Sequence, residues 1–233
     1  MNKNEIVKLS DREHVLKRPN MYIGGLEPIK EKDLFFDFQK QKFEYKEIEY
    51  VPGLLKIINE IIDNSIDEAI KTNFKYANKI SVKINDNEIK VEDNGRGIST
   101  DIEKTTKLPQ AVVAFTHAKS GSNFGNDDER KSIGMNGVGA FCTAVFSKKF
   151  KVETKNNKEL CKISLKNNLN NVNFHKSKSR TKDTYTKISF EPDLERFKLK
   201  EIKEEYKSLV FQRLLMLSQV FPTINFKFNG KTI

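Results

Sequence analysis

The twenty residues from Pro52 to Lys71 constrain the fold more than any other stretch of the chain. Apolar residues recur there at helical spacing: Leu54, Ile57, Ile58, Ile61, Ile62, Ile66 and Ile70. Proline is favoured in the first turn of a helix, so Pro52 suits its start. The pattern predicts an amphipathic helix that buries one whole face against a core.

The opposite face of this helix is acidic although the chain is strongly basic. One polar stripe has spacings of 4, 3 and 4 residues and consists of Glu60, Asn64, Asp67 and Lys71. Two turns hold four carboxylates, those of Glu60, Asp63, Asp67 and Glu68. A solvated face is the ordinary interpretation, but like charges this close are destabilising. The alternative is a set of oxygen ligands for Mg²⁺, beside a carboxylate that orients or deprotonates a water molecule.

Alternating apolar residues predict a hairpin over residues 80–91, whose second strand ends at Asp93. The segment Val91–Ile98 reads V-E-D-N-G-R-G-I. Asn-Gly is a strong turn signal, so a turn is one interpretation. The other is a ligand site, because a carboxylate can accept a hydrogen bond from an adenine amine and glycines let a flat ring approach the backbone.

Glycines also precede a second apolar helix, predicted over residues 140–146. The segment from Gly134 to Gly139 reads G-M-N-G-V-G. Backbone amides at such a position approach phosphate oxygens closely. The segment is neither a Walker loop nor a dinucleotide fingerprint, because the required Lys and glycine spacing are missing.

The other patterns predict a mixed sheet with helices on one face, which is an α+β architecture. Strands are expected at 150–153, 160–165, 184–190 and 224–228, and a helix at 201–219. The first fifty residues read as an arm and a charged connection, 119–134 as a mobile loop and 166–183 as a polar loop. Thr100 and Glu103 have capping-box spacing and predict a short helix.

Composition leaves the role of the charge open. The formal net charge is +10, which suggests an acidic partner such as nucleic acid. Arginine is scarce among the basic residues, so biased coding explains the lysine excess equally well. Cys142 and Cys161 have no metal-site spacing and suggest core thiols in a reducing cytoplasm. Without a signal peptide or a membrane-length apolar run, we expect a soluble cytoplasmic protein with no membrane partner.

The order of three motifs resembles a known ATP-binding fold. E-I-I-D-N-S-I-D-E-A at 60–69, V-E-D-N-G-R-G-I at 91–98 and I-G-M-N-G-V-G at 133–139 are similar to motifs of gyrase, ninety-kilodalton heat-shock chaperones, histidine kinases and MutL-type repair proteins. K-R-P-N-M-Y-I-G at 17–24 narrows the resemblance to type II DNA topoisomerases. The sequence of these motifs is most similar to the large subunit of T-even-like bacteriophage topoisomerases. If the chain is phage-encoded, we expect it to act in the host bacterial cytoplasm.

The resemblance implies a Bergerat (GHKL) two-layer α/β sandwich, with a mostly antiparallel mixed sheet backed by helices. Residues 1–30 would form an N-terminal arm and turn, and 31–233 the ATP-binding domain. By the resemblance, ATP binding closes a dimeric gate for DNA strand passage and hydrolysis resets it. The expected partners are therefore DNA, a second copy of the chain, and topoisomerase subunits that carry the transducer and the DNA-cleaving tyrosine.

Site roles follow from the matching positions. Glu60 matches the general base that activates water, and Asn64 matches the Mg²⁺ ligand. Asp93 matches the carboxylate that binds the adenine amine. Glu68 and Arg96 match an ion pair at the pocket rim. Three further residues match the adenine side of the pocket: Gly97, Ile98 and, through water, Thr186.

A lid that wraps the triphosphate is implied at Asn136, Gly137, Val138 and Gly139, with Lys119 and Ser120 at its start. Ile133 stands where gyrases usually have glycine, Asn136 where they have histidine, and Tyr185 where glycine commonly precedes the threonine. A transducer lysine that contacts the terminal phosphate in the family lies outside these residues. We therefore expect ATP binding with slow hydrolysis. The alternatives are a chaperone-like or MutL-like ATPase, and a basic nucleic-acid-binding module without catalysis.

Overall fold

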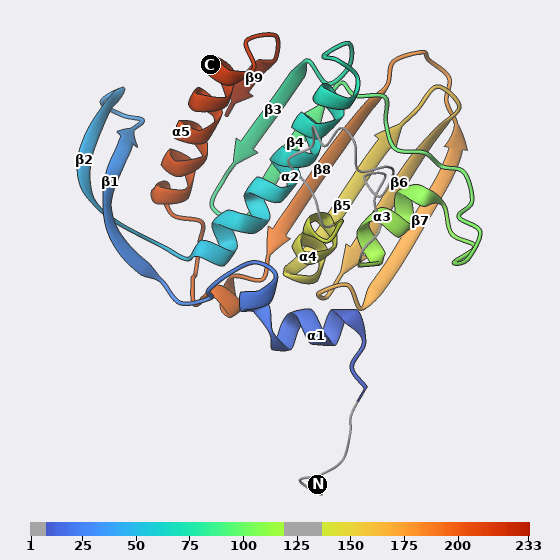
Figure 1. Cartoon of the computed structure of the whole chain (residues 1–233), viewed down its shortest axis with the longest axis horizontal. Coiled ribbons are helices and arrows are strands. Elements are labelled where there is room, and N and C mark those ends of the chain that lie inside the picture. Colours follow the sequence, from blue (N-terminus) through green and yellow to red (C-terminus); the bar gives the residue numbers. More distant parts are fainter. Residues whose placement is uncertain (1–7, 119–136) are drawn as a thin grey trace, which may run out of the picture.

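The computed structural model describes residues 8–118 and 137–233 and contains two sheets (Figure 1). A separate hairpin pairs β1 (Ile29–Asp37) with β2 (Lys42–Tyr50). The main sheet has eight strands in the order β10 (Lys231–Thr232), β9 (Asn225–Phe228), β3 (Lys79–Ile84), β4 (Ile89–Asp93), β8 (Tyr185–Pro192), β5 (Ser147–Lys155), β6 (Glu159–Lys166) and β7 (Asn171–Lys178). Strands β3 and β9 pair in parallel and the other neighbours are antiparallel.

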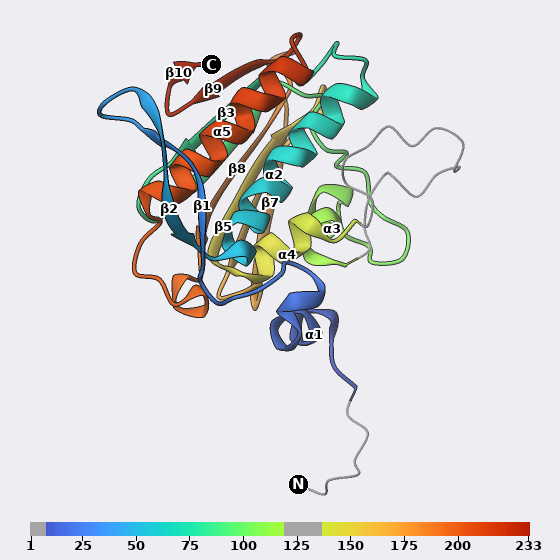
Figure 2. The ribbon, with the colours of Figure 1, turned by 60° about the vertical axis from the view of Figure 1, so that its left-hand side comes forward.

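Helices cover one face of this sheet, as Figures 1 and 2 show. They are α2 (Pro52–Lys71), α3 (Gln110–Thr116), α4 (Gly139–Val145) and α5 (Glu204–Val220). The apolar face of α2 is buried from Leu54 to Ile66 and partly buried at Ile70. Its first turn is fixed by Val51, whose N–H donates to the Tyr206 hydroxyl at 2.7 Å. The predicted helix at 52–71 and the α+β class with a mostly antiparallel sheet are confirmed.

The chain before the β1–β2 hairpin contains α1 (Asp11–Lys17) and a 3-10 turn, η1 (Pro19–Met21). Ser10 and Glu13 cap α1 reciprocally, and Val15 is buried in the common core. His14 Nδ1 lies 2.8 Å from the Tyr22 hydroxyl. The predicted arm is therefore packed against the domain over its described part, while the boundary at residue 30 stays a prediction.

Two segments predicted as irregular are strands. The charged connection in the first fifty residues contains the β1–β2 hairpin, which packs on α5 with the Phe36 and Phe211 ring centroids 4.5 Å apart. The polar loop at 166–183 contains β7, which pairs with β6 along its whole length and is almost entirely exposed. These three strands carry so many charged and polar residues that the alternation of apolar residues is obscured.

The helix predicted at Thr100 is wrong. Thr100 donates its hydroxyl to Glu159 instead of capping a helix, and Glu103 accepts the N–H groups of Thr105 and Thr106. These two bonds hold the Glu103 pKa at about 2. The carboxylate thus closes a turn, and α3 begins ten residues later at Gln110.

Candidate functional site

Asp93 lies at the end of β4 with its carboxylate pointing toward α2. Ser65 donates its hydroxyl to Asp93 Oδ2 at 2.7 Å, and the Gly95 N–H donates to Oδ1 at 2.8 Å. The side chain is buried, and this desolvation raises the Asp93 pKa to about 6, with the nearby Glu68 charge adding to the rise. The carboxylate is thus oriented by two donors and still has acceptor capacity for a ligand.

The glycines after Asp93 are required by the path of the chain. Gly97 has a φ of +72°, and a Cβ atom there would overlap the backbone carbonyl of Lys155. At Gly95 a Cβ atom would lie 2.6 Å from Asp93 Oδ1 and 2.9 Å from Glu68 Cγ. A side chain at either position would therefore overlap protein atoms, while the proposed place of a flat ring beside these glycines stays a prediction. These glycines let the loop fold tightly around Asp93.

The expected pair of Glu68 and Arg96 is present. Arg96 Nε and Nη2 donate to the two oxygens of Glu68 at 2.8 and 3.0 Å, and the Arg96 N–H adds a bond of 3.1 Å. This two-point contact ties the loop after β4 to α2. It also gives the Glu68 carboxylate, which lies near Asp93, a partner of opposite charge.

Thr186 lies directly beside Asp93, because the two residues are paired in the register of β4 and β8. On the other side Thr186 pairs with Thr154 of β5, and their hydroxyl oxygens are 3.3 Å apart. Thr154 also accepts the Ile98 N–H at 2.8 Å. Three adjacent strands therefore bring Asp93, Thr186 and the loop residue Ile98 to one position under α2.

Glu60 lies two turns before Glu68 on the same helix. Its carboxylate forms an ion pair with Lys56 and lies against Gly139, where any Cβ atom would overlap Glu60 Oε2. Thr143 donates to the backbone oxygens of Ile57 and Gly139 at 3.1 and 3.0 Å, which fixes α4 against α2. The absence of a side chain at Gly139 thus lets the start of α4 approach Glu60.

The proposed carboxylate cluster does not form. Asp63 is buried and its carboxylate pairs with Arg213 of α5, while Asp67 is also buried and therefore does not belong to a solvated stripe. Burial raises the Asp63 pKa despite the arginine. Within residues 8–118 and 137–233, no group of three or more His, Cys, Asp or Glu side chains could hold a metal. Asp63 and Glu68 are held apart because Asp63 pairs with α5 and Glu68 pairs with the loop after β4.

The described part of the expected lid begins at Gly137, which has a φ of +60° and leads through Val138 into α4. Lys119, Ser120 and Asn136 lie outside the described residues, as does the loop expected at 119–134.

Three contacting residues had no role in the sequence interpretation. Ser65 holds Asp93, Thr154 joins Thr186 to Ile98, and Lys56 pairs with Glu60. Ser65 had a signal, because a serine in mid-helix lowers helix propensity without an evident local gain. Lys56 also had one, since it lies four residues before Glu60 on the helix. Thr154 had none, because its role depends on strand register.

Cys142 and Cys161 are unpaired and buried, as expected for core thiols, and burial raises the pKa of Cys142 to about 12. Among the described helices, none has the length and apolar character needed to cross a membrane.

The two-layer fold and the site beneath α2 define a protein of the ATP-binding type. The family model described as histidine kinase-, DNA gyrase B-, and HSP90-like ATPase matches residues 54–204, and the chain belongs to this family. This identification and the architecture confirm the GHKL fold class.

Relatives are named as topoisomerases. The chain is 43% identical over 236 residues to the DNA topoisomerase large subunit of Enterobacteria phage T4, covering 100% of this chain and 44% of that protein. It is 32% identical to DNA topoisomerase 2 of Drosophila melanogaster, covering 97% of this chain and 16% of the relative. The chain thus spans less than half the length of either relative.

The similar solved structures are also ATPase regions of type II topoisomerases. The ATPase region of Saccharomyces cerevisiae topoisomerase II superposes with a TM-score of 0.91 at 29% identity, over 98% of this chain and 61% of that one. The ATPase and transducer domains of Balamuthia mandrillaris topoisomerase II give a TM-score of 0.92 at 26% identity, over 100% of this chain and 61% of that one.

Proposed function

We propose that this chain is the ATP-binding and ATP-hydrolysing domain of a type II DNA topoisomerase. The observation that best supports the proposal is the arrangement along α2, where Asp93 and Glu68 lie at one end of the site and Glu60 at the other. Residues 60 and 68 are eight apart, so they are separated by about 12 Å along the helix axis. A nucleoside triphosphate fits such a site lengthwise, with its base at Asp93 and its terminal phosphate at Glu60.

At the adenine end, Asp93 accepts a hydrogen bond from the exocyclic amine. Ser65 and Gly95 already donate to the carboxylate, which fixes the direction of its remaining lone pairs. Thr186, beside Asp93 in the sheet, contacts the base through water, and Gly97 and Ile98 line the pocket edge. Specificity for adenine follows because an acceptor at this position favours an amine over a carbonyl oxygen.

At the phosphate end, Glu60 acts as the general base for the attacking water. Lys56 holds this carboxylate in the site, and the start of α4 lies against it. Gly137, Val138 and Gly139, together with Lys119, Ser120 and Asn136, enclose the triphosphate.

Asn64 is the proposed Mg²⁺ ligand. Its side chain is exposed on α2 between Glu60 and Glu68. A single amide oxygen fits Mg²⁺, which usually keeps several waters and takes further ligands from phosphates. The ion would neutralise the charge that develops on the phosphate oxygens during hydrolysis.

ATP binding would close a dimeric gate during DNA strand passage, and hydrolysis would reset it. The proposed partners are DNA, a second copy of the chain, and other topoisomerase modules that hold the transducer and cleave DNA. The phage relative is named as a large subunit, which supports a multi-subunit enzyme acting in the cytoplasm of a bacterial host.

Calorimetry with a non-hydrolysable ATP analogue tests the nucleotide site. Wild type should bind the analogue in the presence of Mg²⁺, and Asp93→Asn should lose this binding. Asn64→Ala should weaken Mg²⁺-dependent binding of the triphosphate more than binding of adenosine. If wild type and Asp93→Asn behave identically, the assigned adenine site is wrong.

The two rival functions are not favoured. A chaperone-like or MutL-like ATPase would share the family, but the relatives described above are named as topoisomerases. A basic module without catalysis does not account for membership of an ATPase family. It also does not account for the two carboxylates, Glu60 and Asp93, at opposite ends of the proposed site.

A further inference from the structure

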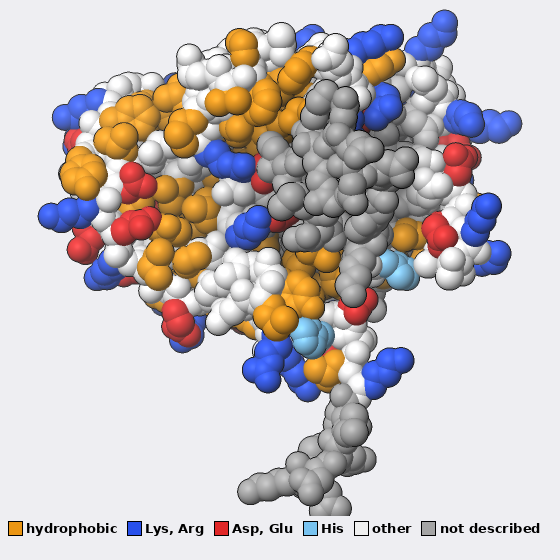
Figure 3. All heavy atoms as spheres, viewed as in Figure 1, with side chains coloured by type: hydrophobic (Ala, Val, Ile, Leu, Met, Phe, Trp, Pro, Cys, Tyr) orange, Lys and Arg blue, Asp and Glu red, His pale blue; other side chains and the backbone are white. Residues whose placement is uncertain are grey.

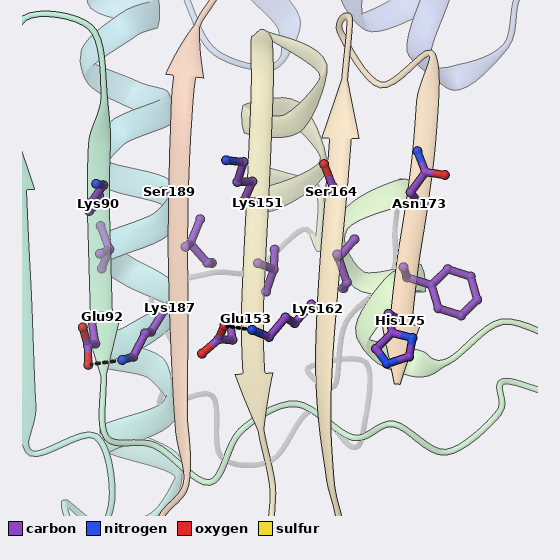
Figure 4. A pocket seen from close by; sticks show the side chains of 15 residues that line it. Lys90, Glu92, Lys151, Glu153, Lys162, Ser164, Asn173, His175, Lys187 and Ser189 are labelled. Atoms are coloured by element: carbon purple, nitrogen blue, oxygen red, sulfur yellow. Dashed lines mark ion pairs between the residues drawn. The ribbon is translucent and has the colours of Figure 1, made fainter. Parts of the chain in front are cut away.

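The face of the main sheet opposite the helices is exposed and basic. Figure 4 shows this open face, with the helices behind the strands and the labelled side chains projecting forward. A shallow depression of about 590 Å³ lies over β4, β8, β5, β6 and β7. It is on the side of the sheet away from the Asp93 carboxylate, so it does not belong to the nucleotide site.

Lysines predominate among the outward side chains of this face. Alternation along the strands places nine exposed lysines there: Lys79, Lys83, Lys90, Lys149, Lys151, Lys162, Lys166, Lys187 and Lys227. The carboxylates of the strands on the same face are Glu92, Glu153 and Glu191, and Glu88 lies beside Lys90 just before β4. Lysine therefore exceeds glutamate by more than two to one, and the face carries a net positive charge.

In one row of side chains that runs across the strands, acidic and basic residues alternate and neutralise one another. This alternating row crosses the strands in register as Glu92, Lys187, Glu153, Lys162 and His175. Lys187 pairs with Glu92 at 3.2 Å and Lys162 with Glu153 at 3.0 Å (Figure 4). Opposite charges on neighbouring strands stabilise one another, so this row needs no external partner.

The next row along the strands is different. This lysine row consists of Lys83, Lys90, Ser189, Lys151, Ser164 and Asn173. Lys83 lies directly opposite Lys90, an arrangement that is destabilising between neighbouring strands. Lys90 has an ion pair with Glu88 at 2.8 Å, whereas Lys83 and Lys151 have no ion pair among the described residues.

We propose that the lysine row binds the phosphate backbone of duplex DNA. The row crosses five strand-to-strand steps, or about 24 Å, which corresponds to about seven base pairs. Lysine provides a mobile point charge for a phosphate, and Ser and Asn supply additional donors to phosphate oxygens. Contacts to phosphate oxygens position a protein on the duplex without reading its bases, so we expect this contact to be independent of sequence.

The chemistry of the row favours DNA over an acidic protein. Protein interfaces are depleted in lysine and depend on aromatic or other large apolar anchors. The outward side chains of the lysine row are lysine, serine and asparagine, so the row offers no such anchor. The inference rests on the proposed function, in which DNA is the substrate of the enzyme to which this domain belongs.

The test compares two triple variants of the whole chain. The first is Lys83→Gln, Lys90→Gln and Lys151→Gln. The matched control is Lys32→Gln, Lys104→Gln and Lys200→Gln, which removes the same charge from exposed positions outside the main sheet. Fluorescence anisotropy measures the binding of a labelled DNA duplex about three helical turns long, at salt concentrations from about 50 to 200 mM.

Wild type should bind with a steep salt dependence. The row variant should bind at least about tenfold more weakly, and the slope of log K against log salt should decrease by about 2 to 3, since each lost phosphate contact removes about 0.9. The control should change the slope by less than about 1. Equal effects of the two variants, or no binding by wild type, would overturn the proposal.

Two further measurements test the chemical class of the ligand and the function of the domain separately. If polyglutamate of matched length displaces the duplex at equal charge concentration, the face takes acidic chains generally and the assignment to DNA is wrong. Calorimetry with the ATP analogue on the same proteins tests the proposed function independently. Intact nucleotide binding with unaltered DNA binding in the row variant would reject this inference alone, while loss of nucleotide binding by wild type would reject the ATPase assignment.

Discussion

Replacing Asp93 with Asn should stabilise the domain while abolishing nucleotide binding. The carboxylate is buried beneath α2, and its pKa is raised to about 6. An Asn side chain has nearly the same shape, so its oxygen can accept the Gly95 N–H while its amide donates to the Ser65 hydroxyl. The variant therefore removes the buried charge and leaves the local packing intact, but it presents a donor where the adenine amine needs an acceptor.

The size and the sign of the effect follow from the pKa. An unfolded Asp has a pKa of about 3.9, so between about pH 4 and pH 6 the folded state binds more protons than the unfolded state. The free energy of unfolding of wild type therefore falls as pH rises through this interval. A shift of about two pKa units corresponds to about 3 kcal/mol of destabilisation of the folded wild type. This destabilisation is absent below about pH 4 and fully present above about pH 7.

Urea denaturation of both proteins from about pH 4 to pH 8 measures this difference, because the contributions of all other titrating groups cancel. The stability of Asp93→Asn relative to wild type should rise by about 3 kcal/mol across the range. A difference that does not vary with pH would refute the argument that the buried carboxylate is destabilised. Retained binding of the ATP analogue by the variant would refute the assigned role in adenine recognition.

Three other substitutions test separate parts of the site. Glu60→Gln should retain nucleotide binding but reduce phosphate release by at least about a hundredfold, as measured in a coupled assay, because the general base is lost. Gly97→Ala should lower the free energy of unfolding by about 2 kcal/mol or more in urea denaturation, since its φ of +72° and overlap with Lys155 both oppose a side chain. An unchanged midpoint would contradict this reasoning. Tyr206→Phe should cost about 1 to 3 kcal/mol in the same assay, because the buried Val51 N–H loses its acceptor; a smaller cost would mean that water replaces the hydroxyl.

Folding also brings exposed apolar side chains together near the β1–β2 hairpin. Figure 3 shows hydrophobic side chains gathered on the side of α5 and the β1–β2 hairpin. Exposed large apolar residues of these elements are Leu34 and Tyr45 of the hairpin and Met216 and Val220 of α5. The sequence offered no such expectation, because the hairpin reads as a charged connection and its apolar residues become neighbours of α5 only after folding.

The spacing of apolar residues along the chain was sufficient to predict the helices and strands in which that spacing is regular. The helix at 52–71, the hairpin ending at Asp93 and the short helix before Phe146 follow from apolar spacing and turn residues within each segment. The pairing of Glu68 with Arg96 was also accessible, but only through the resemblance to a family. The spacing of apolar residues did not predict the β1–β2 hairpin and β7, because charged and polar residues predominate in these strands.

Only the tertiary structure decided which polar groups meet. Asp63 belongs to the same acidic helix face as Glu60, yet it turns to Arg213, which is 150 residues away in the chain. Ser65 reaches Asp93 because α2 crosses the end of β4, and Thr154 reaches Thr186 because β5 and β8 are in register. Helix spacing fixes which side chains share a face, whereas the partner of each depends on long-range packing. The sequence alone therefore determined the order of the motifs and the long helix. The packing of that helix on the sheet decided that Asp63 pairs with Arg213 and Glu68 with Arg96.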